Sequence, residues 1–330
     1  MYTKFKIDCA TADYRLDRYS FDSHIAGALD PLREEWKMSH HIPEVGEFVV
    51  DASKVREADN YGCLGLVLLC AQLLNTFEAS VILYIPGDGS FYDDFFNGGF
   101  FHYASQYSMV LGPSKTAEPK FTSRRTFVTN IIAAKEDISA LCAKFIKNFK
   151  IFLNNISHKL IYVPKESHIE FIGNFVSIGL ELSQNILEHS QTKEDHSPFG
   201  YVSYLLTPEY IDIAVMDLGI GIPVSLGYES TEAESVRAIQ AACRENISAK
   251  KEDGRGLGLY MTKQQVMKME GEMAIRSGKA NVIFNSSNKY YGHGEHAKGT
   301  PFFKGTQIHL RLPLISILED KDGRIEVYDF

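Results

Sequence analysis

The chain has 330 residues, about twice the length of a common single domain, and this length suggests two domains. Apolar residues make up 45% and charged residues 23%, a balance that supports a buried core and excludes a mainly disordered or fibrous protein. The formal net charge of −8 argues against nucleic-acid and polybasic membrane partners. The longest apolar run, residues 63–74, is shorter than the ~20 residues that cross a bilayer.

The cysteines and the N-terminus give an expectation about the compartment. The five cysteines contain no CxxC pair and leave an odd number, which favours reduced thiols and no structural zinc site. The first fifteen residues contain no apolar core of a secretion signal. We therefore expect a cytoplasmic protein with no membrane contact.

Residues 46–85 predict a strand, a helix and a second strand. The β-branched and aromatic residues of GEFVVDAS indicate a buried strand, and SVILYIP indicates another. Between them, apolar residues from Leu64 to Leu74 recur at helical spacing. A βαβ unit with parallel strands is the expected arrangement, within an α/β domain over residues 1–115.

A polar, proline-marked segment separates the two halves of the chain, and we place a linker at residues 116–125. Beyond it, apolar spacing predicts two long helices, the second of them amphipathic. The predicted elements after the linker are a strand at 125–132, helices at 135–155 and 166–191, and strands at 200–207, 210–218 and 307–313.

The second long helix carries a polar ridge of Glu181, Asn185 and His189. Residues four apart lie on the same side of a helix, so a carboxylate, an amide and an imidazole follow one another beside the apolar stripe. Taken alone, such a ridge is usually a solvated helix face.

Two further motifs follow the predicted strands. In VMDLGIGIP an apolar strand leads to Asp217, and Gly219 and Gly221 permit backbone shapes that other residues resist. By itself this is most often a strand-ending turn. Gly305 and Thr306 directly precede the strand at 307–313, and alone they read as an ordinary strand start.

The segment DGRGLGLYMTKQQV places a glycine-rich turn before a helix, where unpaired backbone N–H groups can bind a phosphate. The chain contains no GxxxxGK[ST] motif, which excludes a P-loop. A charged segment, and no strand, precedes the glycines, which argues against a Rossmann fingerprint.

Taken together and in chain order, with DGRGLG before Gly305 and Thr306, the four motifs resemble the N-box, G1, G2 and final Gly-Thr elements of the GHKL (histidine kinase-like, HATPase_c) ATPase superfamily, over residues 122–316. ELSQNILEHS is most similar to the N-box of the anti-sigma factor serine kinases. The resemblance implies an α/β sandwich over residues 126–316, with a mixed, mainly antiparallel sheet covered on one face by helices, and a tail at 317–330.

The resemblance also implies ATP and Mg²⁺ as cofactors. Asn185 would coordinate Mg²⁺, Glu181 would act as general base, and Asp217 would accept a hydrogen bond from the adenine amino group. Residues 223–253 would form a lid, on which Lys250 and Lys251 are either phosphate contacts or a solvated run. The implied nucleotide-binding set is Asn185, Asp217, Gly219, Gly221, Gly254, Arg255, Gly256, Leu257, Gly258 and Thr306.

The same kind of pocket serves both hydrolysis and phosphotransfer, because phosphoryl transfer depends mostly on positioning and charge neutralisation. The leading hypothesis is an ATPase or serine/threonine kinase-like regulator whose nucleotide state controls a protein partner. The alternatives are a sensor-type histidine kinase without a recognisable phosphoacceptor domain, for which SHKL at 157–160 is a faint H-box, and a non-catalytic ATP-binding scaffold. We expect no transducer domain after residue 313. The sequence does not decide between a monomer and a homodimer.

Residues 40–110 resemble a STAS-like domain, the module of anti-sigma factor antagonists. The turn that carries a phosphorylated serine in antagonists here contains Tyr61, so we expect a docking or sensing module that is phosphorylated neither there nor at Ser53. The alternative is a generic α/β domain. In the second half, His293 and His296 form an HxxH pair in a glycine-containing segment that predicts a loop, with no third metal ligand set by the sequence.

Overall fold

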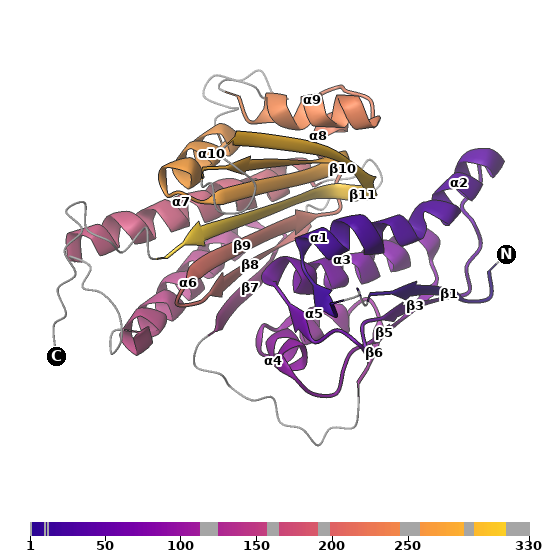
Figure 1. Ribbon diagram of the computed structural model, residues 1–330, viewed down its shortest axis with the longest axis horizontal. Coiled ribbons are helices and arrows are strands. Elements are labelled where there is room, and N and C mark those ends of the chain that lie inside the picture. The colour runs from indigo at the N-terminus through magenta and orange to yellow at the C-terminus, as the bar shows by residue number, and fades with distance from the viewer. Residues whose placement is uncertain are drawn as a thin grey trace. The chain divides into compact units, whose positions relative to one another are not determined.

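The structure is a computed structural model that describes residues 2–9, 11, 13–112, 125–156, 165–190, 199–244, 258–286 and 294–314. The chain divides into two compact units (Figure 1). The first unit comprises Met1–Thr122 together with Thr300–Lys304, and the second comprises Ser123–Gly299 and Gly305–Phe330. Except for Arg125, the linker predicted at 116–125 lies outside the described residues.

The first unit is built on a parallel sheet with the strand order β1-β3-β5-β6. Phe48 pairs with Val81 and Val50 pairs with Leu83, so the βαβ unit predicted over residues 46–85 is present. The described elements are β1 (Phe5–Asp8), β2 (Arg15–Leu16), α1 (Arg18–Ser20), η1 (Phe21–Ile25), η2 (Ala26–Leu29), α2 (Asp30–Ser39), β3 (Glu47–Asp51), β4 (Glu57–Ala58), α3 (Asn60–Phe77), β5 (Ser80–Tyr84), α4 (Ser90–Asn97), α5 (Phe100–Ala104) and β6 (Met109–Leu111).

Helix α3 forms the apolar centre of the first unit. The carboxylate of Asp59 begins it by accepting a hydrogen bond from the backbone N–H of Gly62 at 2.7 Å. Among the described helices, α3 alone is long and apolar enough to cross a membrane, and 78% of it is buried inside the structure. A helix that is apolar on every side is typical of a buried core position, and α3 has that position here.

Residues 300–304, which the sequence alone assigns to the second domain, belong to the first unit. The Phe303 side chain is fully buried, and its ring centroid lies 5.5 Å from that of Phe21 in an edge-to-face arrangement. The Arg33 guanidinium lies 5.7 Å from the centroid of the Phe302 ring. This short stretch of the C-terminal strand is therefore part of the first unit's packing.

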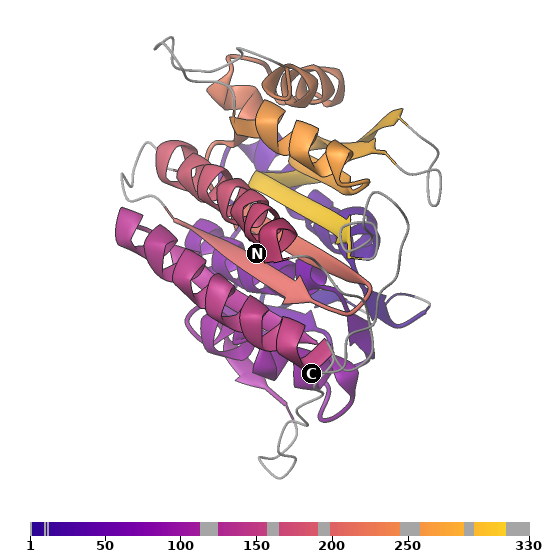
Figure 2. The same cartoon turned by 90° about the vertical axis from the view of Figure 1, so that its left-hand side faces the viewer.

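The second unit contains a sheet with the strand order β10-β11-β9-β8-β7. The pairs β7–β8, β8–β9 and β9–β11 are antiparallel. Helices α6, α7 and α10 lie side by side on one face of this sheet (Figure 2). The described elements are β7 (Thr126–Ile132), α6 (Lys135–Ile156), α7 (Lys165–His189), β8 (Gly200–Leu206), β9 (Tyr210–Asp217), α8 (Gly221–Ser225), α9 (Glu232–Ala242), α10 (Gly258–Lys268), β10 (Glu272–Asn285) and β11 (Gly294–Pro313).

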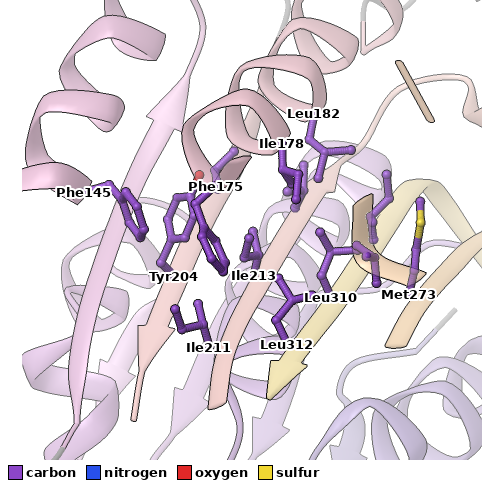
Figure 3. Packing of buried hydrophobic residues seen from close by; sticks show 14 of the residues in the cluster. Phe145, Phe175, Ile178, Leu182, Tyr204, Ile211, Ile213, Met273, Leu310 and Leu312 are labelled. Atoms are coloured by element: carbon purple, nitrogen blue, oxygen red, sulfur yellow. The ribbon is translucent and has the colours of Figure 1, made fainter. Parts of the chain in front are cut away.

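The core of the second unit lies between these helices and the sheet (Figure 3). Phe175, Ile178 and Leu182 of α7 point toward the strands, as the apolar stripe of this helix predicts. Helix α7 approaches β8 closely at Gly179, where an added β-carbon would overlap the hydroxyl of Tyr204. The packing fixes α7 on the sheet and leaves its polar ridge beside the core.

Strand β10 and the first part of β11 are absent from the sequence-based prediction. Arg276, Ser277, Gly278 and Lys279 interrupt the apolar pattern of β10, and Gly278 has a φ of 64°, so the sequence reads as a turn although the strand continues. The loop predicted around His296 is also wrong, because this residue lies in β11 with an exposed side chain.

The predicted lid segment, residues 223–253, contains helical structure packed on the sheet. Helix α9 packs on β10, with Ile239 and Cys243 in the core cluster. The Thr231 hydroxyl caps this helix by accepting from the backbone N–H of Glu234 at 3.3 Å. Residues 245–253 of the segment lie outside the described residues.

Candidate functional site

Helix α7 places its polar ridge along one line. Glu181 is exposed, and Asn185 and His189 are partly buried. The ridge spans two helical turns, about 12 Å along the helix axis. Neighbouring apolar residues such as Leu182 and Ile186 are buried in the core, so the ridge is held in a fixed position beside the sheet.

The first residue of α10 meets the ridge at its Glu181 end. A β-carbon built on Gly258 would lie 2.7 Å from Oε2 of Glu181 and 3.9 Å from Nδ2 of Asn185. The G2 glycine and the N-box, far apart in the sequence, are therefore neighbours in the fold. A residue without a side chain at position 258 allows α10 to approach these two side chains this closely.

The side-chain nitrogen Nδ2 of Asn185 is buried and has no hydrogen-bond partner among the described residues. A buried amide without a partner is costly, and most such groups in proteins are paired. Rotating the amide by 180° exchanges its nitrogen and oxygen, which places a metal-ligating oxygen in the same spot. The site therefore fits a ligand that bonds to the Asn185 amide. Mg²⁺ is such a ligand, because it prefers oxygen atoms.

Asp217 ends β9, and one of its carboxylate oxygens accepts hydrogen bonds from the backbone of the G1 turn and of β11. Oδ1 accepts from the N–H of Gly219 at 2.7 Å and from the N–H of Thr306 at 3.3 Å. No described residue donates to Oδ2, which leaves this oxygen for another donor. Burial raises the pKa of Asp217 to about 6, although the two N–H groups act in the opposite direction.

The pKa of a second carboxylate on β9, Asp212, is shifted in the opposite direction, and the difference between the two surroundings explains both shifts. Burial alone would raise the pKa of Asp212, but Arg311 holds it well below its usual range. Arg311 donates to the two oxygens of Asp212 at 2.8 and 2.9 Å. Among the described residues no cation lowers the pKa of Asp217, so burial dominates there and the carboxylate titrates near neutral pH.

Two glycines allow the G1 turn to pack tightly. A β-carbon on Gly219 would lie 2.6 Å from the carbonyl oxygen of His189, so this turn closes against the end of α7. Gly305 has a φ of 84°, and a β-carbon there would overlap the carbonyl of Asp217. The G1 turn, the end of α7 and the Gly305–Thr306 segment are thereby brought together around Asp217.

Ser277 of β10 belongs to this cluster although the sequence did not single it out. Its Oγ accepts from the N–H of Ile222 at 2.9 Å and donates to the carbonyl of Gly305 at 2.9 Å. The Thr306 hydroxyl lies 3.3 Å from the same oxygen. The only indication in the sequence is the Ser277-Gly278 pair within an otherwise apolar stretch, and such a pair is equally typical of an ordinary turn.

Several predicted site residues lie outside the described part of the chain. These are Lys250, Lys251, Gly254, Arg255, Gly256 and Leu257, together with His293 and the SHKL segment at 157–160. In the ranges that are described, no group of three or more His, Cys, Asp or Glu residues gathers for a metal ion.

One comparison with known protein families gives a match. Residues 174–316 match the family of histidine kinase-, DNA gyrase B- and HSP90-like ATPases, HATPase_c. The match covers less than half of the chain and lies within the second unit apart from Thr300–Lys304. Residues 174–316 therefore form an ATP-binding domain of the GHKL type. No match is found among curated proteins.

Proposed function

We propose that the second unit binds ATP together with Mg²⁺ along helix α7, with the adenine at Asp217 and the phosphates at Asn185 and Glu181. The observation that supports this orientation most strongly is the proximity of Gly258 to Glu181 and Asn185. It brings the start of α10, whose first N–H groups have no partner within the helix, to one end of the ridge.

At the adenine end, Oδ2 of Asp217 accepts a hydrogen bond from the adenine amino group, and Oδ1 stays bound to Gly219 and Thr306. Thr306 supports this end through its hydroxyl, which Ser277 orients. An acceptor fixed in this way favours adenine over a base with a carbonyl at the same position, because two acceptors would then face each other.

At the phosphate end, Asn185 supplies one oxygen ligand and Glu181 lies one turn away with its carboxylate exposed. Asn185 would hold Mg²⁺ here, and the ion would supply charge neutralisation at the phosphates. Glu181 takes the proton from the attacking group, either a water molecule or the hydroxyl of a protein substrate. Gly258 allows the start of α10, with its backbone N–H groups, to approach both side chains closely.

We further propose that the nucleotide state of this site controls a protein partner. Thr306, at the adenine end, is separated only by Gly305 from residues 300–304, which belong to the first unit. A shift of Thr306 on nucleotide binding is therefore passed along the peptide chain itself to the first unit. The first unit is the candidate docking or sensing module.

The test is calorimetric titration of the full chain with ATP, with and without Mg²⁺. Asn185→Ala should abolish the Mg²⁺-dependent part of ATP binding, because it removes the metal ligand and leaves the apolar stripe of α7 intact. Gln184→Ala is the matched control, since Gln184 is exposed on the same helix and its described bond is to Glu188. Unchanged affinity of the Asn185 variant in Mg²⁺ would refute the assignment.

A second measurement identifies the reaction. The chain is incubated with γ-labelled ATP, alone and with candidate partner proteins, and the label is followed. Release as free phosphate indicates an ATPase, and transfer to a serine or threonine of a second protein indicates a kinase. Acid-labile label on a histidine of the chain would favour the histidine-kinase alternative instead.

A further inference from the structure

The first unit contains a cavity of about 670 Å³ at one edge of its parallel sheet. Strands β3 and β5 end at Asp51 and Tyr84, and the loops that follow them form most of the cavity wall. Ligands of open α/β sheets bind in the crevice outside the carboxyl ends of the strands. The cavity therefore lies at the sheet edge from which α/β folds bind their ligands.

The two loops are held to each other, so the cavity is formed in advance. The carbonyl oxygen of Arg56 accepts from the N–H of Phe91 at 3.1 Å and from the hydroxyl of Ser90 at 2.8 Å. Val55 between them is buried and forms part of the wall. Preorganised walls reduce the ordering that ligand binding would otherwise require.

Tyr14 fixes the direction of one cation at the cavity. It has a φ of 57°, which is unusual for a residue other than glycine, and its carbonyl accepts from the N–H of Arg56 at 2.9 Å. The Arg56 guanidinium lies 4.8 Å from the centroid of the Tyr14 ring. An arginine stacked on an aromatic ring has its in-plane N–H donors free for a phosphate or a carboxylate.

Two cations, Lys54 and Arg56, and two carboxylates, Glu57 and Asp88, line the cavity. Asp51, beside it, is bound by Lys6 at 2.7 Å, and Glu57 is paired with Arg15 at 3.6 Å. No described residue forms an ion pair with the wall residues Lys54, Arg56 or Asp88. With Glu57 paired to Arg15, the two wall cations exceed the remaining wall carboxylate, Asp88, by one charge.

Helix α4 adds to this positive character. It begins at Ser90 on the cavity wall, and no side chain caps it. Its first N–H groups carry the partial positive charge of a helix N-terminus. Gly89 precedes it with a φ of 94° and open space where a β-carbon would be, so the backbone borders the cavity directly.

We propose that this cavity binds a small phosphorylated molecule that also carries hydroxyl groups. Lys54 and Arg56 bind the phosphate, since two cations match its double negative charge. Asp88, an acceptor-only group when ionised, binds the hydroxyls. This site is separate from the nucleotide site of the second unit and gives the first unit a chemical signal of its own to sense.

The experiment uses the full chain at low ionic strength, with inorganic phosphate and ribose 5-phosphate as probes and ligand-detected NMR titration as the readout. Both probes should bind, and the sugar phosphate should bind more tightly. Lys54→Gln and Arg56→Gln should each weaken the binding of both probes about tenfold, the usual effect of losing one hydrogen bond to a charged group. Lys37→Gln, an exposed residue of α2 with the same charge change, should have no effect.

Asp88→Asn separates the contribution of the phosphate to binding from that of the sugar hydroxyls. This variant should bind inorganic phosphate more tightly, because a nearby negative charge is removed. It should also show a smaller preference for ribose 5-phosphate over inorganic phosphate. The proposal is overturned if neither probe binds at about 10 mM, a concentration that detects even weak sites. It is also overturned if binding survives in Lys54→Gln/Arg56→Gln and is lost in Asn185→Ala, which would locate the probe in the second unit. These readouts do not depend on ATP binding.

Discussion

The raised pKa of Asp217 predicts that ATP affinity depends on pH in a way that reports on the adenine contact. The carboxylate form accepts from the adenine amino group, whereas the protonated form presents its own hydrogen to that donor. With a pKa of about 6, roughly nine tenths of Asp217 is ionised at pH 7 and roughly one tenth at pH 5. ATP affinity should therefore fall about tenfold between these values.

Inosine triphosphate gives the internal control for this experiment. Its base carries a carbonyl where adenine carries the amino group, so the protonated Asp217 donates to it and the ionised form repels it. ITP affinity should rise as ATP affinity falls, and the ratio of the two dissociation constants should change roughly 100-fold between pH 7 and 5. Titration of the triphosphate itself affects both nucleotides alike and leaves the ratio unchanged.

The assay is calorimetric titration of each nucleotide at about five pH values in constant Mg²⁺. In Asp217→Asn the ratio should lose its pH dependence, and ATP should bind about tenfold or more weakly because the amide can turn its NH₂ toward the adenine donor. A wild-type ratio that does not change with pH would refute adenine recognition by this carboxylate.

The same pKa predicts the stability of the ligand-free protein. The folded state holds the Asp217 proton more tightly than the unfolded state, whose pKa is near 3.8. This group therefore contributes most stability below about pH 4, and the contribution is lost as the pH rises through about 6. The ligand-free protein and the ATP complex should thus respond to this carboxylate in opposite directions.

Three further predictions follow from the site and from the first unit. Glu181→Ala should change ATP affinity by no more than a few-fold, while the rate of hydrolysis or phosphotransfer falls ~10²-fold or more. Turnover at the wild-type rate would show that another residue is the general base. Gly305→Ala should lower the midpoint of thermal unfolding far more than Gly227→Ala; both positions have a positive φ, but the β-carbon is in open space at Gly227 and overlaps Asp217 at Gly305. Equal losses would show that the close approach is unimportant. Mass spectrometry after incubation with Mg²⁺-ATP should find Tyr61 unmodified, because its side chain is 1% exposed and its hydroxyl donates to Asp22 at 3.2 Å; stoichiometric phosphate there would contradict this.

The local sequence determined the long elements and the residue types of the site. Helices α3, α6 and α7 follow from apolar spacing alone, because each has one face or all faces packed in a core. The order of Asn185, Asp217, Gly258 and Thr306 carried the family resemblance, and the family match to residues 174–316 agrees with it. The STAS-like character of the first unit stays a prediction.

Other features depend on contacts between residues distant in the sequence, which no local pattern encodes. Strand β10 continues through Gly278 because β11 pairs with it, whereas the sequence there reads as a turn. Ser277 enters the site only through its bonds to Ile222 and Gly305. Residues 300–304 belong to the first unit for the same reason.

The sequence by itself thus determined which groups are available: a carboxylate and an amide on one helix face, an aspartate before two glycines, and glycines at the start of a further helix. Only the tertiary structure decided how close these groups lie and what their surroundings are. Burial sets the pKa of Asp217, and the neighbouring chain sets the space beside Gly258 and the cavity beside Arg56. Periodicity reports which side of an element is apolar, but burial and electrostatic fields are sums over the whole fold.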